Sequence, residues 1–159
     1  MNGINSFLTD WGIRFLENKD SIRKEIAGID KNCDGFDFII NCKDKAKCFI
    51  VMPLLEDDIF TRLKEDSYFG AITLNNPANI RFVAGHWDKL ASFKFLSIYF
   101  VNPFSESDKA WAIIPQVHNK ICDRASLELG LKSIAEMVAP LGVEELNNKV
   151  RLLREESGL

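Results

Sequence analysis

The expected fold is decided by residues 22–53, whose sequence is IRKEIAGIDKNCDGFDFIINCKDKAKCFIVMP. Three short strands are predicted here, at 22–29, 36–42 and 47–52, with two polar turns between them. Apolar residues recur at every second position from Phe36, which is the period of a strand, and 48–52 is almost continuously apolar. Pro53 ends the third strand because proline cannot donate to a strand ladder. We therefore expect a three-stranded meander.

Helices and further strands are predicted on either side of this meander. Apolar residues at helical spacing predict helices at 4–18, 54–64, 77–90, 123–138 and 143–155. Asn76 and Pro77 fit the N-cap and first position of the third of these helices. Strands are predicted at 69–74, 95–101 and 110–114. The expected fold is α/β, or α+β at its N-terminal end, with a mixed sheet of about six strands flanked by helices.

Length and composition narrow the class of protein. The chain has 159 residues, 47% apolar and 27% charged, so we expect one domain with a core of its own. Neither a run of ~18 apolar residues nor a signal-peptide pattern is present, which favours a cytoplasmic protein that does not enter a membrane. The net charge of −3 gives no overall attraction to nucleic acid, so binding would need a local basic patch. The four cysteines lack zinc-site spacing and are expected to be reduced thiols: Cys33, Cys42, Cys48 and Cys122.

The segment DKNCDG, residues 30–35, matches the first half of a calcium-binding loop. The second half fails, because Asn41 stands at the twelfth position and cannot supply a bidentate carboxylate. The same residue types form tight hairpin turns, since Asn, Asp and Gly tolerate left-handed backbone conformations. The hairpin is the favoured interpretation.

The order helix, three strands, helix, strand resembles the core of the PD-(D/E)XK, or restriction-endonuclease-like, superfamily. In that family an acid at the start of the second strand and an acid–x–Lys motif at the end of the third hold Mg²⁺ and activate water for phosphodiester cleavage. Asp37 matches the first acid, but the third strand ends in Val51-Met52-Pro53. The resemblance implies a nuclease-like core at 1–101 and an extension of one strand and two helices at 102–159, within a single domain.

By this resemblance the chain is a catalytically degenerate domain without a cofactor. Its function would be to bind a nucleic acid, a protein partner or a second copy of itself. The alternative is a divergent nuclease in which Asp37 holds Mg²⁺, one of Glu56, Asp57 or Asp58 replaces the missing acid, and Lys47 replaces the missing lysine. Acids in the first turn of a helix are also favoured simply by the helix dipole, so the acids at 56–58 have a plain structural explanation.

A second alternative is a small-ligand site in QVHNKICD, residues 116–123, which connects a strand to a helix. Here His118 and Lys120 could contact a phosphate or a carboxylate, in a closed pocket lined by Trp111 and His118. The plain interpretation is a turn before a helix, with Asp123 as the helix cap.

Overall fold

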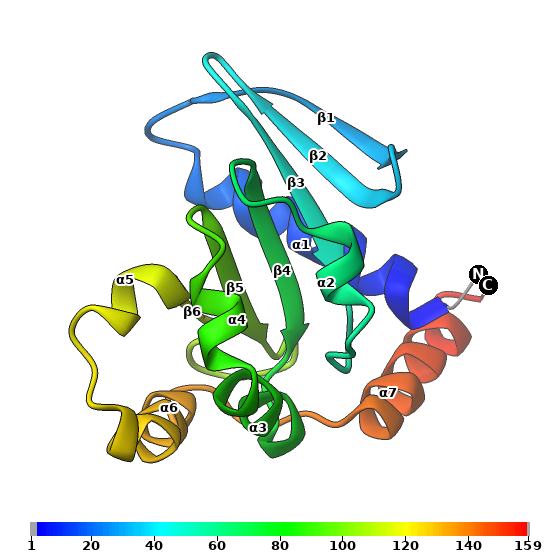
Figure 1. The fold of residues 1–159 in the computed structure, drawn as a ribbon. Helices are drawn as coiled ribbons and strands as arrows, with labels where there is room; N and C mark the ends of the chain where they lie inside the picture. Colours follow the sequence, from blue (N-terminus) through cyan, green and yellow to red (C-terminus); the bar gives the residue numbers. More distant parts are fainter. Residues whose placement is uncertain (1–2, 159) are drawn as a thin grey trace.

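The computed structural model describes residues 3–158, which form an α+β fold built on one mixed sheet (Figure 1). Six strands lie in chain order across the sheet within this range, so the prediction of about six strands is confirmed. β1, β2 and β3 are antiparallel neighbours, β3, β4 and β5 are parallel, and β6 is antiparallel to β5. The strands are β1 (Ile26–Cys33), β2 (Phe36–Cys42), β3 (Ala46–Val51), β4 (Tyr68–Leu74), β5 (Leu96–Val101) and β6 (Ala110–Ile113).

Helices cover both faces of this sheet. Figure 1 shows α1 behind the strands and α2, α3 and α4 in front of them. None of the helices in the described part of the chain is long and apolar enough to cross a membrane. The helices are α1 (Gly3–Lys19), α2 (Ile59–Arg62), α3 (Pro77–Gly85), α4 (Trp87–Ala91), α5 (Pro115–Asn119), α6 (Leu127–Ala135) and α7 (Val143–Glu156), with a 3₁₀ turn at Arg124–Ser126.

Two hydrophobic cores form because alternate strand residues point to opposite faces of the sheet. Along β3, Ile50 joins the core beneath α2, α3, α4 and α6, whereas Phe49 and Val51 join the core beneath α1 and α7. Gly12 allows α1 to lie close to the sheet, since a Cβ atom there would be 2.7 Å from Cδ1 of Ile72. The result is a three-layer arrangement with the sheet in the middle.

The turn between β1 and β2 consists of residues 34–35 alone, because β1 continues through residues 30–33 to Cys33 where the strand was predicted to end at 29. Cys33 pairs with Phe36, and the two residues between them, Asp34 and Gly35, have φ angles of 53° and 80°. Two consecutive positive φ angles are typical of the two-residue turns that match the twist of a hairpin. Across the strands, Asn41 Nδ2 donates to Asp30 Oδ2 at 2.9 Å, which joins the first and twelfth positions of the calcium-loop pattern.

Predicted boundaries are wrong where a side chain binds the backbone. The first strand begins at Ile26, not at residue 22, because both carboxylate oxygens of Asp20 accept backbone N–H groups, from Glu25 and Ile26, each at 2.9 Å. The second helix is reduced from 54–64 to α2 because Leu55 donates its backbone N–H to the Asn79 side chain at 2.8 Å.

Two other predicted helices are interrupted. Residues 77–90 form α3 and α4, with a break at His86, whose φ and ψ angles of −114° and 23° are not helical. Its ring nitrogen Nδ1 lies 2.9 Å from the carbonyl oxygen of Phe82, so the ring binds the end of α3. Residues 123–138 form a 3₁₀ turn capped by Asp123 and the shorter helix α6, while α5 was not predicted.

A network of buried asparagines lies at the carboxyl ends of β4 and β5. Asn75 Nδ2 donates to the carbonyl oxygens of Ala135 at 3.1 Å and Val138 at 2.8 Å. Its Oδ1 accepts from Nε1 of Trp111 at 2.7 Å. Asn102 Nδ2 donates to the carbonyl oxygen of Ala139 at 2.9 Å. These bonds attach the segment after α6 to two adjacent strands.

Asn79 extends the network to the segment after β3. Its Nδ2 donates to the carbonyl oxygens of Pro53 at 2.9 Å and Leu74 at 2.8 Å. Asn76 accepts the Asn79 backbone N–H at 3.0 Å, which confirms Asn76 as the N-cap of α3. Among residues 3–158, no buried side-chain nitrogen or oxygen lacks a hydrogen-bond partner.

We expect Asn75→Ala to lower the free energy of unfolding by about 2–4 kcal/mol, because it removes the partner of Nε1 of Trp111 and the Asn75 amide bonds to the carbonyl oxygens of Ala135 and Val138. Urea denaturation monitored by tryptophan fluorescence measures the change. Asn147→Ala, at an exposed position of α7, is the matched control and should change stability by less than about 0.5 kcal/mol. Equal effects in the two variants would show that the network does not stabilise the fold.

Candidate functional site

Asp37 lies at the start of β2 and binds the end of β3. Its Oδ2 accepts the backbone N–H of Val51 at 2.7 Å and lies 3.8 Å from Nη2 of Arg62. The registered pairs of β2 and β3 end at Phe38 and Phe49, two residues before Val51. The carboxylate therefore satisfies a backbone donor beyond the end of the β2–β3 ladder, which is a structural role.

Asp37 also lines a polar cavity of about 270 Å³ beside α1. Asp10 of α1 lies in the same cavity, and its Oδ1 is 2.5 Å from Nζ of Lys31. Each of the two carboxylates thus already faces a cation, Lys31 or Arg62. In the part of the chain that the structure describes, no three His, Cys, Asp or Glu side chains are grouped so that they could hold a metal ion. The cavity lining is Asn5, Ser6, Thr9, Asp10, Lys31, Asn32 and Asp37.

The other residues of the divergent-nuclease hypothesis lie elsewhere. Glu56 is exposed, and Oδ1 of Asp57 is 3.2 Å from Nε2 of His86. Lys47 precedes Val51 by four residues on β3, which is about 13 Å at the rise of a strand. The hydrogen bonds and ion pairs recorded for residues 3–158 join none of Asp37, Lys47, Glu56 and Asp57 to one another.

The residues proposed for a small-ligand site make separate contacts in the structure. Trp111 is buried, stacks on Phe100 with ring centroids 4.2 Å apart, and donates to Asn75 in the core. His118 lies on α5, with Nδ1 3.2 Å from the carbonyl oxygen of Ile114, and Lys120 is exposed just after this helix. None of the hydrogen bonds and ring contacts recorded among residues 3–158 joins Trp111 to His118.

A cavity of about 200 Å³ does lie beside His118, but its tryptophan is Trp87. Nε1 of Trp87 donates to Oδ1 of Asn119 at 2.9 Å, which ties α4 to α5. Cys122 and Asp123 also line this cavity, and Asp123 caps the following 3₁₀ turn through the backbone N–H of Ala125 at 3.2 Å. The polar groups here are mainly used to hold the helices together.

Positive charge gathers at the opposite end of β3 from Asp37. A groove of about 550 Å³ contains the cations Lys19, Arg23, Lys45 and Lys47. It also contains two acids, of which Asp20 is engaged by two backbone N–H groups. We call this the basic groove; its other lining residues are Leu16, Glu25, Ile26, Ile40, Cys42, Phe49 and Tyr99.

Lys47 lies half-buried in the wall of the basic groove. Its Nζ donates to Oγ of Ser97 at 3.3 Å and lies 5.4 and 5.8 Å from the ring centroids of Phe49 and Tyr99. Burial, with a smaller contribution from the charge of Lys45, lowers the pKa of the Lys47 ammonium to about 8. None of the ion pairs recorded among residues 3–158 includes Lys47. A half-buried cation of this kind is a candidate for binding an anion.

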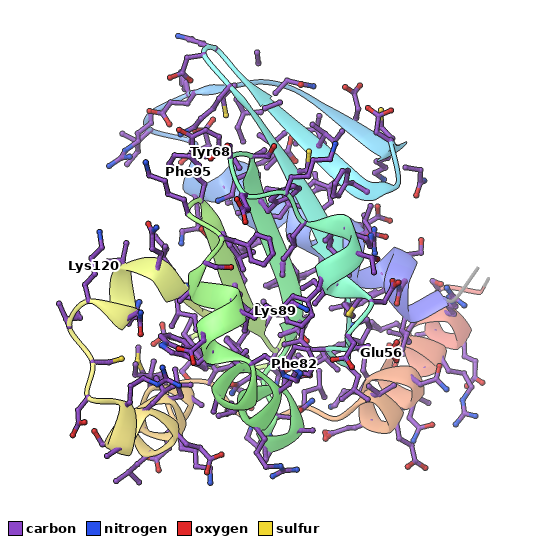
Figure 2. All side chains as sticks on the ribbon, viewed as in Figure 1. Glu56, Tyr68, Phe82, Lys89, Phe95 and Lys120 are labelled. Carbon is purple, nitrogen blue, oxygen red and sulfur yellow. The ribbon has the colours of Figure 1, made fainter. Side chains whose placement is uncertain are left out.

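Two aromatic rings continue the groove onto the neighbouring strands. Tyr68 and Phe95, at the starts of β4 and β5, stack with ring centroids 4.3 Å apart (Figure 2). Nζ of Lys45 lies 4.4 Å from the Tyr68 ring centroid, and Nζ of Lys94 lies 5.3 Å from that of Phe95. We call these four residues the aromatic–basic ladder.

The sequence prediction missed Tyr68, Phe95 and Lys94 because it assigned no pairing partners to the later strands. The structure pairs Phe69 with Leu96 in parallel register, which brings the two preceding residues, Tyr68 and Phe95, side by side. Parallel pairing of the two strands, inferred from the intervening helix, would have been the available signal.

Comparison with known protein-family models, curated proteins and solved structures finds no match for this chain.

We expect Lys47→Met to raise the free energy of unfolding at pH 7 by about 1–3 kcal/mol, because it removes a charge whose burial is unfavourable. The folded pKa of about 8 lies below the unfolded value of 10.5, so the unfolded chain binds more protons between these pH values. Wild-type stability should therefore rise with pH across this window relative to the variant. Urea denaturation of both proteins from pH 7 to 10 measures the difference, and a difference independent of pH would contradict the assignment.

Proposed function

We propose that the chain is a catalytically degenerate nuclease-like domain that binds nucleic acid through the basic groove and the aromatic–basic ladder. The observation that carries the proposal is the position of Lys47, half-buried in a groove that holds three further cations. A chain with a net charge of −3 has concentrated positive charge on one surface. Local basic patches of this kind are the usual electrostatic feature of nucleic-acid binding.

The order of elements and the end of β3 support a nuclease-like domain that has lost its catalytic site. The observed order α1, β1–β3, α2, β4 agrees with the order that the nuclease resemblance implies. At the end of β3, Val51 is buried and apolar and Pro53 follows, so neither supplies the acid or the lysine of the motif. The residues present do not fit the metal site of that family, which favours binding without cleavage.

Nucleic acid fits this surface better than an acidic protein segment does. Lys47 pairs with Tyr68 across β3 and β4, so the basic groove and the ladder are continuous on one face of the sheet. Cations there can contact phosphates, while half-buried rings can contact bases. An acidic protein segment has the negative charges but lacks the planar base that accompanies each phosphate of a nucleic acid.

The first test is binding of a fluorescein-labelled 20-nucleotide DNA or RNA, measured by fluorescence anisotropy. We expect micromolar affinity at low salt that weakens as salt is raised, because neutralised phosphates release counterions. The double variant Arg23→Glu/Lys45→Glu should weaken binding at least about tenfold. It should also make binding less dependent on salt. The slope of log binding constant against log salt concentration should become shallower by ~0.7 for each phosphate of a single strand that the variant no longer neutralises.

The matched control is Lys120→Glu, an exposed charge reversal beside α5 that Figure 2 shows away from Tyr68 and Phe95. We expect it to leave binding almost unchanged. Absence of binding at about 100 µM protein and low salt would overturn the proposal, because non-specific affinities normally reach this range. If Lys120→Glu alone weakened binding, the site would lie at the 116–123 turn instead.

A second candidate function is Mg²⁺-dependent cleavage at Asp37. One observation favours it: Asp37 and Asp10, from different elements, line the same polar cavity. Carboxylate oxygens are the protein ligands that Mg²⁺ prefers.

Asp37→Asn and Asp37→Ala distinguish the two candidates. We expect Asp37→Asn to be nearly as stable as wild type, because its amide oxygen can still accept the Val51 N–H, whereas Asp37→Ala should lose about 1–3 kcal/mol. Urea denaturation measures this. A calorimetric titration with Mg²⁺ should give the same result for wild type and Asp37→Asn. Binding heat that is present in wild type and absent in Asp37→Asn would support cleavage.

A further inference from the structure

We propose that the nucleic acid bound by this domain is single-stranded, and that one of its bases stacks on the Tyr68–Phe95 pair. This inference rests on the proposed function and specifies its ligand. The stacked base would lie on the outer face of one ring, with its phosphates next to Lys45, Lys94 and the basic groove.

The ladder has a defined geometry. The Tyr68 and Phe95 rings are 21° from parallel, with centroids 4.3 Å apart, so each ring uses one face for the other. The Lys45 ammonium lies 4.4 Å from the Tyr68 centroid, and the Lys94 ammonium lies 5.3 Å from the Phe95 centroid. Both lysines are exposed, while both rings are half-buried. The rings are therefore fixed in place and the cations that cover them are movable.

A base can exchange with a lysine on these ring faces. An exposed cation–π contact contributes about 0.5–1 kcal/mol, whereas stacking of a base on an aromatic side chain contributes about 1–3 kcal/mol. The displaced ammonium stays nearby on its flexible stem and can contact the phosphate next to the stacked base. The exchange keeps the charge interaction and adds a stacking interaction.

A single strand is required because the ring faces of the bases in a duplex are covered by their neighbours. Exposing one base from a duplex costs a few kcal/mol, which would cancel the gain from stacking. The basic groove lies directly beside the ladder, because Lys47 and Tyr68 are register partners. A flexible strand can therefore place a base on the ladder and a neighbouring phosphate at Lys47.

The experiment compares a labelled single-stranded oligonucleotide with a duplex of the same length and sequence at one salt concentration. We expect wild type to bind the single strand at least about fivefold more tightly. Tyr68→Leu should remove most of this preference by weakening binding of the single strand, and Tyr68→Phe should retain it because stacking does not need the hydroxyl group. The equivalent Phe82→Leu variant, at another half-buried ring, is the matched control (Figure 2).

A second readout is the fluorescence of 2-aminopurine placed in the single strand, which changes when the base stacks on a ring. Urea denaturation of each variant checks that it is folded, and Phe95→Leu replaces Tyr68→Leu if the latter is unstable. This inference would be overturned if the single strand and the duplex bound equally well and Tyr68→Leu did not weaken binding. If Arg23→Glu/Lys45→Glu still weakened that binding, the proposed function would stand. Absence of binding to either form would overturn both.

Discussion

The hydrogen bonds of the buried asparagines hold the architecture together. Asn75 and Asn79 lie at the carboxyl end of β4 and bind segments that are distant in sequence, including the carbonyl oxygens of Pro53 and Val138. These segments have irregular backbone, whose buried polar groups would otherwise be unpaired. An amide side chain is suited to this task because it offers two donors and an acceptor without a charge. The packing of α3 and α6 against the sheet depends on these bonds, since the same residues fix where each helix begins or ends.

This network explains why the two ends of the sheet differ. In many α/β proteins ligands bind at the carboxyl ends of parallel strands. Here Asn75 and Asn102 bind the carboxyl ends of β4 and β5 to the segment after α6. The cavity of about 350 Å³ that remains at this end is lined mainly by apolar residues of α3, of α6 and of the segment after α6. The amino ends of β3, β4 and β5 carry exposed or half-buried cations and rings instead, among them Lys47 and Tyr68. The binding function is therefore proposed at the amino ends, where these cations and rings lie together.

Much of the fold could be predicted from periodicity, and the errors have local causes. The alternation after Phe36 and the apolar run before Pro53 predicted β2 and β3 within one residue. The starts of β1 and of the second helix differ from the prediction because the side chains of Asp20 and Asn79 bind backbone groups there. Hydrophobic periodicity carries no information about such bonds. The candidate site was less predictable. Asp37 was placed correctly on its strand, yet the tyrosine and phenylalanine of the ladder meet only through parallel pairing of β4 and β5, which are separated by two helices.

The burial of Lys47 has a consequence for proton balance. With a pKa of about 8, a fraction of the free protein carries a neutral amine at mildly alkaline pH. An anion that binds beside this side chain favours the charged form and so raises its pKa. Binding near pH 8 would therefore take up part of a proton from the solvent. The proton comes from the buffer, so the heat of binding would vary with the ionisation enthalpy of the buffer, while the affinity at fixed pH would not.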